Sequence, residues 1–207
     1  MNSKDVFNEV NEILLKKMKP SEHINSLIKR GCFDEDPFNK IKNLAKIEQN
    51  LKYHPEGSAL NHVLMVVDKG SEVKYLSKNE KVFMWACLLH DIGKLTTTRI
   101  RKGRITSYNH DIEGEKIGQD FLNLVSDDKI FNEEVSKLIR WHMQPLFYDK
   151  NLPFFEPKHM LEDVDYKEVA LISYCDRLGR GNLSEETIKL ENKRIESFKE
   201  YCKTHKS

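Results

Sequence analysis

The stretch Trp85-Ala86-Cys87-Leu88-Leu89-His90-Asp91-Ile92-Gly93-Lys94 determines how the rest of the chain is interpreted. Its first five residues are apolar, which predicts a buried central helix, and Gly93 predicts the point where that helix ends. His90 shares a helical stripe with Ala86 and Cys87 and therefore faces inward. A buried imidazole next to a carboxylate costs free energy unless a metal ion or another charge satisfies both groups. The stretch therefore predicts a metal site at a helix end.

The composition is typical of a single water-soluble domain. The chain has 207 residues, of which 39% are apolar and 32% charged, and its formal net charge is +1. So small a net charge does not predict binding to long nucleic acid, although it is compatible with a local phosphate-binding site. The first residues lack an apolar signal region, and no run of roughly 18 apolar residues is found, so we expect a cytoplasmic protein without membrane contact. The four cysteines form no C-x-x-C pair, which predicts reduced thiols.

Apolar residues recur at helical spacing along most of the chain and predict an all-α bundle. The predicted helices cover residues 5–18, 21–31, 37–50, 58–76, 109–124, 132–145 and 168–178, and a last helix starts after Ser184. The predicted N-caps are Ser21, Ser58, Asn109, Asn132 and Ser184. Residues 96–108 alternate around a Lys-Gly turn signal and predict a short hairpin or an extended loop. We expect a helical extension over residues 1–36 and the main domain over residues 37–207, in one globular unit.

Inward polar side chains are predicted on four of these helices and at the start of a fifth. They are His62, His90 with Asp91, His110, His142 and Asp176. Taken singly, each histidine has the ordinary explanation of a core side chain bonded to a backbone carbonyl. Taken together, nitrogen and oxygen donors without cysteine are the set expected for a divalent metal ion with room for bound water.

Two further segments have open interpretations. Arg99, Arg101, Lys102 and Arg104 place positive charge near the predicted site, either as a rim that attracts phosphate or as solvated charge on a hairpin. Residues 146–157 are rich in aromatic side chains, which either cover a base and shield the site from water or form core beneath a loop.

The order His62, His90-Asp91, Asp176 resembles the metal-binding signature of the HD phosphohydrolase superfamily, and His90-Asp91-Ile92-Gly93-Lys94 looks like its central motif. His110 and His142 fill the intermediate positions of members with two metals. A more local resemblance, over residues 37–183, is to the HD domain joined to bacterial tRNA nucleotidyltransferases. It adds Gln49, His54-Pro55-Glu56-Gly57, Gly103-Arg104, Asp111, Pro145 and residues 176–181 to the residues above.

The resemblance implies a compact all-α HD domain that acts as a metal-dependent phosphohydrolase, with metal-activated water as the nucleophile. Its implied substrates are nucleotide or RNA-end phosphates: 2′,3′-cyclic phosphodiesters, nucleoside monophosphates or dinucleoside polyphosphates. The chain is short for a nucleotidyltransferase head and has no Walker-type Gly-Lys-Ser, so neither CCA addition nor kinase activity is expected. The alternative function is a non-catalytic module that uses its metal to bind a nucleotide or an RNA end. In a third interpretation, the histidines have a purely structural role and make only hydrogen bonds within the core.

The resemblance also assigns roles to residues. His62, His90, Asp91 and Asp176 are the implied ligands of a first divalent ion, and His110 and His142 of a second. Manganese, iron, nickel, zinc and magnesium are all open as its identity.

Lys94 joins Asp91 as the candidate catalytic pair, since it is placed either to neutralise a phosphate oxygen in the transition state or to be merely solvated. Arg104, Arg177 and Arg180 are candidate phosphate ligands, although Arg177 is also suited to pairing with a ligand carboxylate. Whether His54 and Glu56 contribute is left open, as is the oligomeric state.

Overall fold

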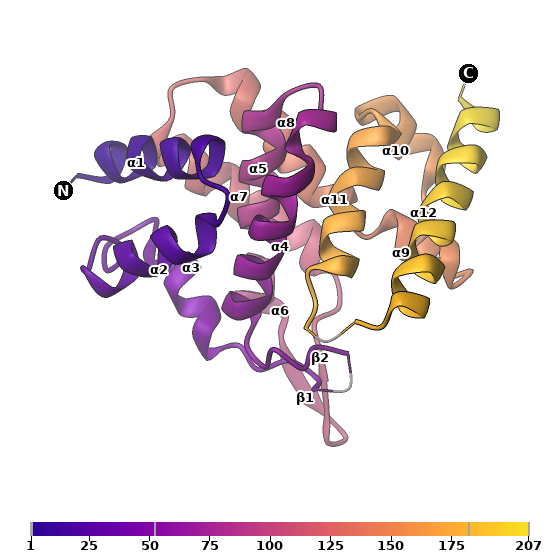
Figure 1. Ribbon diagram of the computed structural model, residues 1–207, viewed down its shortest axis with the longest axis horizontal. Helices are drawn as coiled ribbons and strands as arrows, with labels where there is room; N and C mark the ends of the chain where they lie inside the picture. The colour runs from indigo at the N-terminus through magenta and orange to yellow at the C-terminus, as the bar shows by residue number, and fades with distance from the viewer. Residues whose placement is uncertain (1, 52, 182, 207) are drawn as a thin grey trace.

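The computed structural model describes residues 2–51, 53–181 and 183–206, which form a bundle of helices from which one two-stranded hairpin projects (Figure 1). The all-α prediction and the hairpin after the central motif are therefore confirmed. The helices are α1 (Ser3–Lys16), α2 (Pro20–Lys29), α3 (Asn39–Asn43), η1 (Leu44–Lys46), α4 (Ala59–Val73), η2 (Lys74–Leu76), α5 (Glu80–Leu89), α6 (Lys94–Thr97), α7 (His110–Val125), α8 (Lys129–Trp141), α9 (Gln144–Asp149), α10 (Pro157–Asp163), α11 (Tyr166–Leu178) and α12 (Glu185–His205). The strands are β1 (Arg99–Arg101) and β2 (Arg104–Thr106).

Helix α5 is the centre of the core. Every side chain from Val82 to Leu89 is buried, so the helix has no polar face to turn towards solvent. It packs against α1, α4, α8 and α11, which together surround it. Because α5 is enclosed on all sides, the residues that follow its last turn are delivered into the interior of the protein.

The N-terminal helices pack on this core. The ring of Phe7 stacks on that of Trp85 with centroids 4.7 Å apart, and the Trp85 indole donates a hydrogen bond to Asn11 at 3.2 Å. These contacts join α1 directly to α5. The predicted boundary at residue 36 stays a prediction.

Several predicted helix ends are wrong. Ser21 does not cap α2, which begins at Pro20; its amide and hydroxyl donate to Asp68 instead. Asn132 lies inside α8, because Asp128 accepts from the Phe131 amide and starts the helix earlier. The predicted helix over residues 37–50 is reduced to α3 and η1. Pro145 lies in the first turn of α9 instead of ending the preceding helix.

The predicted caps at Ser58 and Ser184 are confirmed, since each hydroxyl accepts from the amide three residues later. Asn109 precedes α7 as expected, but its backbone is left-handed and its side chain makes no capping bond. Among the described helices, none combines the length and apolar character that crossing a bilayer requires.

Gly93 has a different role from the predicted helix stop. Helix α5 already ends at Leu89, and Gly93 instead lets the start of α7 approach the turn after α5. A Cβ at this position would lie 2.0 Å from the His110 carbonyl oxygen and 2.5 Å from the Gly114 amide nitrogen. Only a residue without a side chain fits, because both neighbours are backbone atoms.

Replacing Gly93 by alanine should therefore lower the free energy of unfolding by at least about 1–3 kcal/mol, the usual cost of overpacking. Urea denaturation of the variant and the wild type measures this difference in the free energy of unfolding. Gly181→Ala is the matched control, since a Cβ there would meet nothing closer than 3.8 Å and should change stability by less than about 0.5 kcal/mol. Equal stability of the two variants would contradict the assigned packing role.

Candidate metal centre

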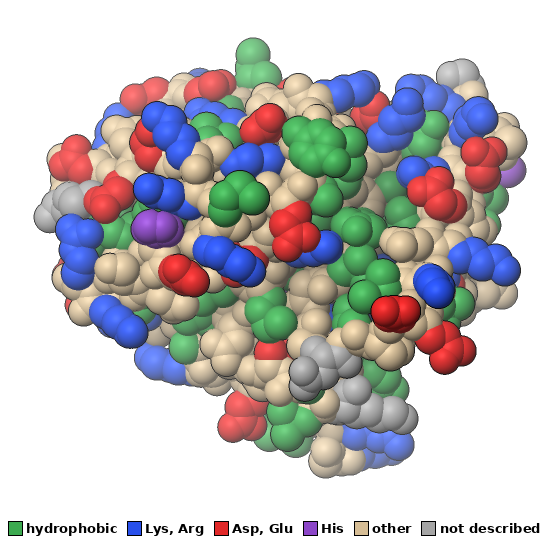
Figure 2. All heavy atoms as spheres, in the orientation of Figure 1, with side chains coloured by type: hydrophobic (Ala, Val, Ile, Leu, Met, Phe, Trp, Pro, Cys, Tyr) green, Lys and Arg blue, Asp and Glu red, His purple; other side chains and the backbone are tan. Residues whose placement is uncertain are grey.

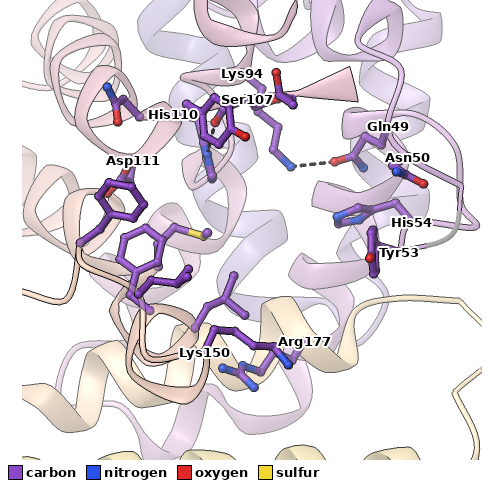
Figure 3. A pocket seen from close by; sticks show the side chains of 18 of the residues that line it. Gln49, Asn50, Tyr53, His54, Lys94, Ser107, His110, Asp111, Lys150 and Arg177 are labelled. Carbon is purple, nitrogen blue, oxygen red and sulfur yellow. Dashed lines mark hydrogen bonds between the residues drawn. The ribbon is translucent and has the colours of Figure 1, made fainter. Parts of the chain in front are cut away.

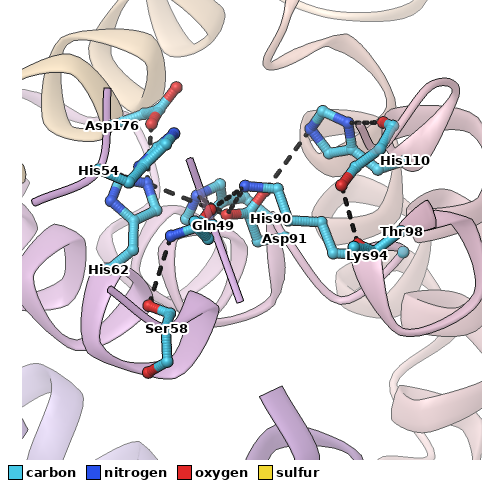
Figure 4. A network of polar contacts seen from close by, with 12 residues as sticks. Gln49, His54, Ser58, His62, His90, Asp91, Lys94, Thr98, His110 and Asp176 are labelled. Atoms are coloured by element: carbon cyan, nitrogen blue, oxygen red, sulfur yellow. Dashed lines mark hydrogen bonds and ion pairs between the residues drawn. The ribbon is translucent and has the colours of Figure 1, made fainter. Parts of the chain in front are cut away.

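Five histidines from different parts of the chain form a continuous row, and Figure 4 labels four of them: His54, His62, His90 and His110. From His54 through His62, His90 and His142 to His110, successive ring centroids lie 4.8, 5.4, 5.3 and 5.2 Å apart. They come from the loop before α4, from α4, and from the ends of α5, α8 and α7 respectively. The fold thus brings together all four of the predicted histidines and adds His54.

Three of these rings are oriented in the same way. In His90, His110 and His142, Nδ1 lies 2.9, 2.8 and 2.7 Å from the carbonyl oxygen three residues earlier, so a proton there is donated to the backbone. This fixes the tautomer that leaves the lone pair on Nε2. Burial lowers the pKa of both His90 and His110 to about 4, which keeps these two rings neutral at pH 7. They are in the state that binds a metal ion.

Asp91 lies between these rings. Its Oδ2 is 3.5 Å from His90 Nε2 and 3.9 Å from His62 Nε2, and its Oδ1 is 3.5 Å from His110 Nε2. Burial alone would raise the pKa of Asp91, but the Lys94 ammonium and the surrounding histidines hold it well below its usual range. Asp91 is therefore a buried carboxylate anion, with Oδ2 near His62 and His90 and Oδ1 near His110.

His62 lies between two other carboxylates. Its Nε2 is 2.9 Å from Asp176 Oδ1, and its Nδ1 is 2.9 Å from Glu56 Oε1, although this second contact lacks the alignment of a hydrogen bond. Burial acts to lower the pKa of His62, but the two carboxylates outweigh it and raise the pKa. His62 and Asp176 therefore face each other in a position where they can share a metal ion in place of a proton.

The donor set fits a divalent ion. Among the described residues, the groups able to hold one include His62 with His90 and Asp91, and Asp91 with His110 and His142. His90 Nε2 is fully buried and has no hydrogen-bond partner among the residues that the structure describes, which is costly unless an ion accepts its lone pair. Mixed imidazole and carboxylate donors with no thiolate suit the first-row divalent metals.

Lys94 is not solvated. It is 8% exposed, and its ammonium donates to Asp91 Oδ2 at 2.7 Å and to Gln49 Oε1 at 2.6 Å. The sequence motif placed Lys94 one turn after the metal ligands, but Gln49 comes from 45 positions earlier and only the fold reveals it. The ammonium is held at the edge of the cluster, where it faces the adjoining cavity (Figure 3).

That cavity has a volume of about 750 Å³ and reaches the cluster at His54, Lys94 and His110. Figure 3 shows Lys150 and Arg177 at the opposite end from Lys94. Its aromatic lining residues are Tyr53, Tyr108, Phe147 and Phe154, and its cationic ones besides Lys94 are Arg140, Lys150, Arg177, Arg180 and Arg194. Within the aromatic segment, Phe147 and Phe154 line the cavity, whereas Tyr148 and Phe155 pack against Phe198 in the core. The core role is thus confirmed for part of the segment, and the covering of a base stays a prediction.

The predicted arginines lie in three different environments. Arg177 is buried and pairs with Glu191 and, at 3.8 Å, with Asp149, not with a candidate metal ligand. Arg180 lines the cavity with its Nη2 3.7 Å from Asp176 Oδ1. Arg104 is exposed on β2 and is not among the residues that line the cavity. Their role in phosphate binding stays a prediction.

Sequence patterns did not assign two pairs near the cluster. Glu56, whose side chain is only 3% exposed, contacts His54 Nδ1 and His62 Nδ1, both at 2.9 Å. Asp111 accepts from Arg140 at 3.0 Å at the cavity wall. Neither pair follows a periodic pattern, because the partners come from a loop or from separate helices. The available signal was the family resemblance, which included Glu56 and Asp111 without giving them a role.

Residues 52–181 match the family model described as the HD domain, and the chain belongs to that family. Its members are in general metal-dependent hydrolases, which agrees with the cluster of histidines and carboxylates. Two relatives are the proteins named Multifunctional CCA protein from Actinobacillus pleuropneumoniae serotype 5b (strain L20) and serotype 7 (strain AP76). Each is 29% identical over 87 residues, which is 42% of this chain and 20% of the relative, so the match spans a fifth of their length.

Glu56 should support metal binding by holding the His62 ring. Glu56→Ala is expected to weaken binding of Mn²⁺ by about 10–100-fold, the usual effect of removing a group that orients a ligand. Glu56→Gln keeps an oxygen in contact with His62 Nδ1 and should lose much less. Isothermal titration calorimetry measures both, with Glu48→Ala as a control that removes a carboxylate from the cavity wall alone. Wild-type affinity in Glu56→Ala would contradict this role.

Proposed function

We propose that this chain is a metal-dependent phosphohydrolase acting on nucleotide or RNA-end phosphates. The observation that carries the proposal is the shared orientation of three imidazoles, each with Nδ1 on a backbone carbonyl, around the Asp91 carboxylate. Core histidines that serve only packing have no reason to leave a buried nitrogen without a partner, as His90 Nε2 is left.

The proposed ligands form two overlapping sets. His62, His90, Asp91 and Asp176 would hold one divalent ion, and Asp91 with His110 and His142 a second. A bound ion would polarise a phosphoryl oxygen and lower the pKa of a coordinated water from 15.7 towards roughly 7. Asp91 belongs to both sets because its two oxygens face different histidines. Loss of Asp91 should therefore affect both ions.

Lys94 has the position of a cation that neutralises phosphate. Its ammonium is shared between Asp91 and Gln49 and borders the cavity, so a phosphoryl group beside Asp91 comes within its field. Because the ammonium is already oriented, it needs little reorganisation as negative charge builds up on the phosphate.

The cavity supports a substrate of nucleotide size. Its volume of about 750 Å³ lies within the range of small-molecule sites. Aromatic side chains offer faces for a base, and the arginines and lysines offer partners for phosphate. The candidate substrates are 2′,3′-cyclic phosphodiesters, nucleoside monophosphates and dinucleoside polyphosphates. The similarity to proteins named for CCA favours the first of these, which is a group found at RNA ends.

The test is hydrolysis of a panel containing these three substrate classes, after metal removal and reloading with Mn²⁺, Ni²⁺, Zn²⁺ or Mg²⁺. The wild type should show turnover that depends on added metal, and Asp91→Ala should lose it by at least about 10³-fold, since a shared ligand is removed. Tight, metal-dependent nucleotide binding without turnover on any substrate would contradict the hydrolase proposal and support the binding module.

Lys94→Met separates the proposed roles of Lys94 and of the ligands. The variant should lose about 10²–10³-fold in kcat. It should bind the metal at least as tightly as the wild type, because the cation that competes for Asp91 is gone. Lys116→Met, which removes an exposed cation paired with Glu113 that does not line the cavity, is the control and should retain kcat. Unchanged kcat in Lys94→Met would show that Lys94 only neutralises Asp91.

A further inference from the structure

The segment that follows the central motif carries an unusual charge distribution. Residues 92–109 contain no Asp or Glu, although the chain has 33 of them in 207 residues. The same segment contains five cations, of which Lys94 is buried in the cluster and the other four are on the hairpin: Arg99, Arg101, Lys102 and Arg104. The net charge of +1 therefore conceals a strongly positive local surface.

Neighbouring carboxylates among the described residues do not neutralise this charge: Arg99 donates to the carbonyl of the preceding residue at 2.8 Å, and the Arg101 guanidinium lies 5.6 Å from the Tyr108 ring centroid. Arg101 pairs directly across the strands with Arg104, and like charges in that position repel. Lys102 occupies the first turn position with φ of 50°, in the left-handed region that lysine disfavours. Within the described part of the chain, no carboxylate forms an ion pair with any of the four cations. The four cations therefore stay available to an anion from outside the chain.

The hairpin is continuous with the candidate active site. Thr106 and Tyr108 line both the large cavity and a second hollow whose other walls are Arg101, Lys102 and Arg104. In Figure 1 the hairpin projects from the helical body, and in Figure 2 the same projection shows Lys and Arg side chains near its end. An anionic chain that leaves the cavity past Tyr108 thus meets the hairpin cations next.

The exposed apolar groups of the hairpin indicate the kind of anion. Ile100 and Tyr108 are 75% and 62% exposed, and the Arg101 guanidinium lies 5.6 Å from the Tyr108 ring centroid. An exposed aromatic ring beside several cations suits a single-stranded nucleic acid, because a base stacks on the ring while the phosphates bind the cations. A membrane surface needs a wider apolar face than one isoleucine between three-residue strands provides.

We propose that the hairpin, residues 99–106, binds the single-stranded RNA that leads away from the phosphate held at the metal cluster. The inference rests on the proposed function for the position of the RNA end. It makes the substrate an oligonucleotide end in place of a free nucleotide. The hairpin contacts only a few phosphates, so this binding agrees with the small net charge.

Fluorescence anisotropy with a labelled 12-nucleotide single-stranded RNA of mixed sequence, ending in a 3′-phosphate, tests the proposal. The variant Arg99→Gln/Arg101→Gln/Lys102→Gln removes three exposed cations, and Lys16→Gln/Lys17→Gln/Lys29→Gln removes three from the distant helices α1 and α2 and the residue after α1. At about −0.7 per phosphate contact, the three hairpin cations contribute a slope of about −2 in log K against log salt. This corresponds to about 20-fold weaker binding at 200 mM than at 50 mM salt.

The hairpin variant should bind the RNA at least about tenfold more weakly at 50 mM salt and lose this salt dependence, while the α1–α2 variant binds as the wild type does. Equal loss in both variants, or no RNA binding by the wild type, would overturn the proposal. So would hairpin-dependent binding to phosphatidylglycerol vesicles without RNA binding. Circular dichroism confirms that each variant folds. Metal-dependent turnover of bis(p-nitrophenyl) phosphate by the wild type tests the proposed function separately, because that substrate is too small to reach the hairpin.

Discussion

The Asp91 carboxylate holds the polar centre of this protein together. It lies within 4 Å of His62, His90, His110 and Lys94, which come from both sides of the cluster. A buried carboxylate is tolerated only when cations or hydrogen bonds surround it, so the helices that supply these groups must meet at one point. Lys94 supplies a compensating charge for Asp91, but His90 Nε2 has no hydrogen-bond partner among the described residues. A divalent ion satisfies the carboxylate and the imidazoles together, which is why the cluster is most simply understood as a metal centre.

The fold delivers these groups by ending helices at the site. His90 and His142 are the C-terminal cap residues of α5 and α8, and His110 is the first residue of α7. In this position a histidine can bond its Nδ1 to a carbonyl three residues back and still direct Nε2 inward. The close approach of α7 to the turn at Gly93 then brings His110 to Asp91. The packing of the core around α5 therefore also sets the geometry of the site. Any change that displaces one of these helix ends also displaces a candidate metal ligand.

Much of this centre could be predicted from the sequence, and the exceptions have physical reasons. His90, His142 and Asp176 were identifiable because a polar residue on an apolar helical stripe stands out against a period of 3.6 residues. His62 lay on a face adjoining such a stripe and was identifiable only together with the others. Glu56 and His54 could not be assigned, since a loop has no periodicity and only the fold brings it to His62. The burial of Lys94 depends on Gln49, which no local pattern connects to it. The wrong helix starts at Ser21 and Asn132 reflect competition: a proline or an earlier aspartate began the helix first.

Elemental analysis of the purified protein by mass spectrometry, after stripping and reloading with divalent ions and exhaustive dialysis, tests the central claim most directly. The account predicts one or two retained ions per wild-type chain and none in Asp91→Ala at equal folding by circular dichroism. A wild-type protein that retains no ion, or an Asp91→Ala variant that retains as many as the wild type, would contradict it.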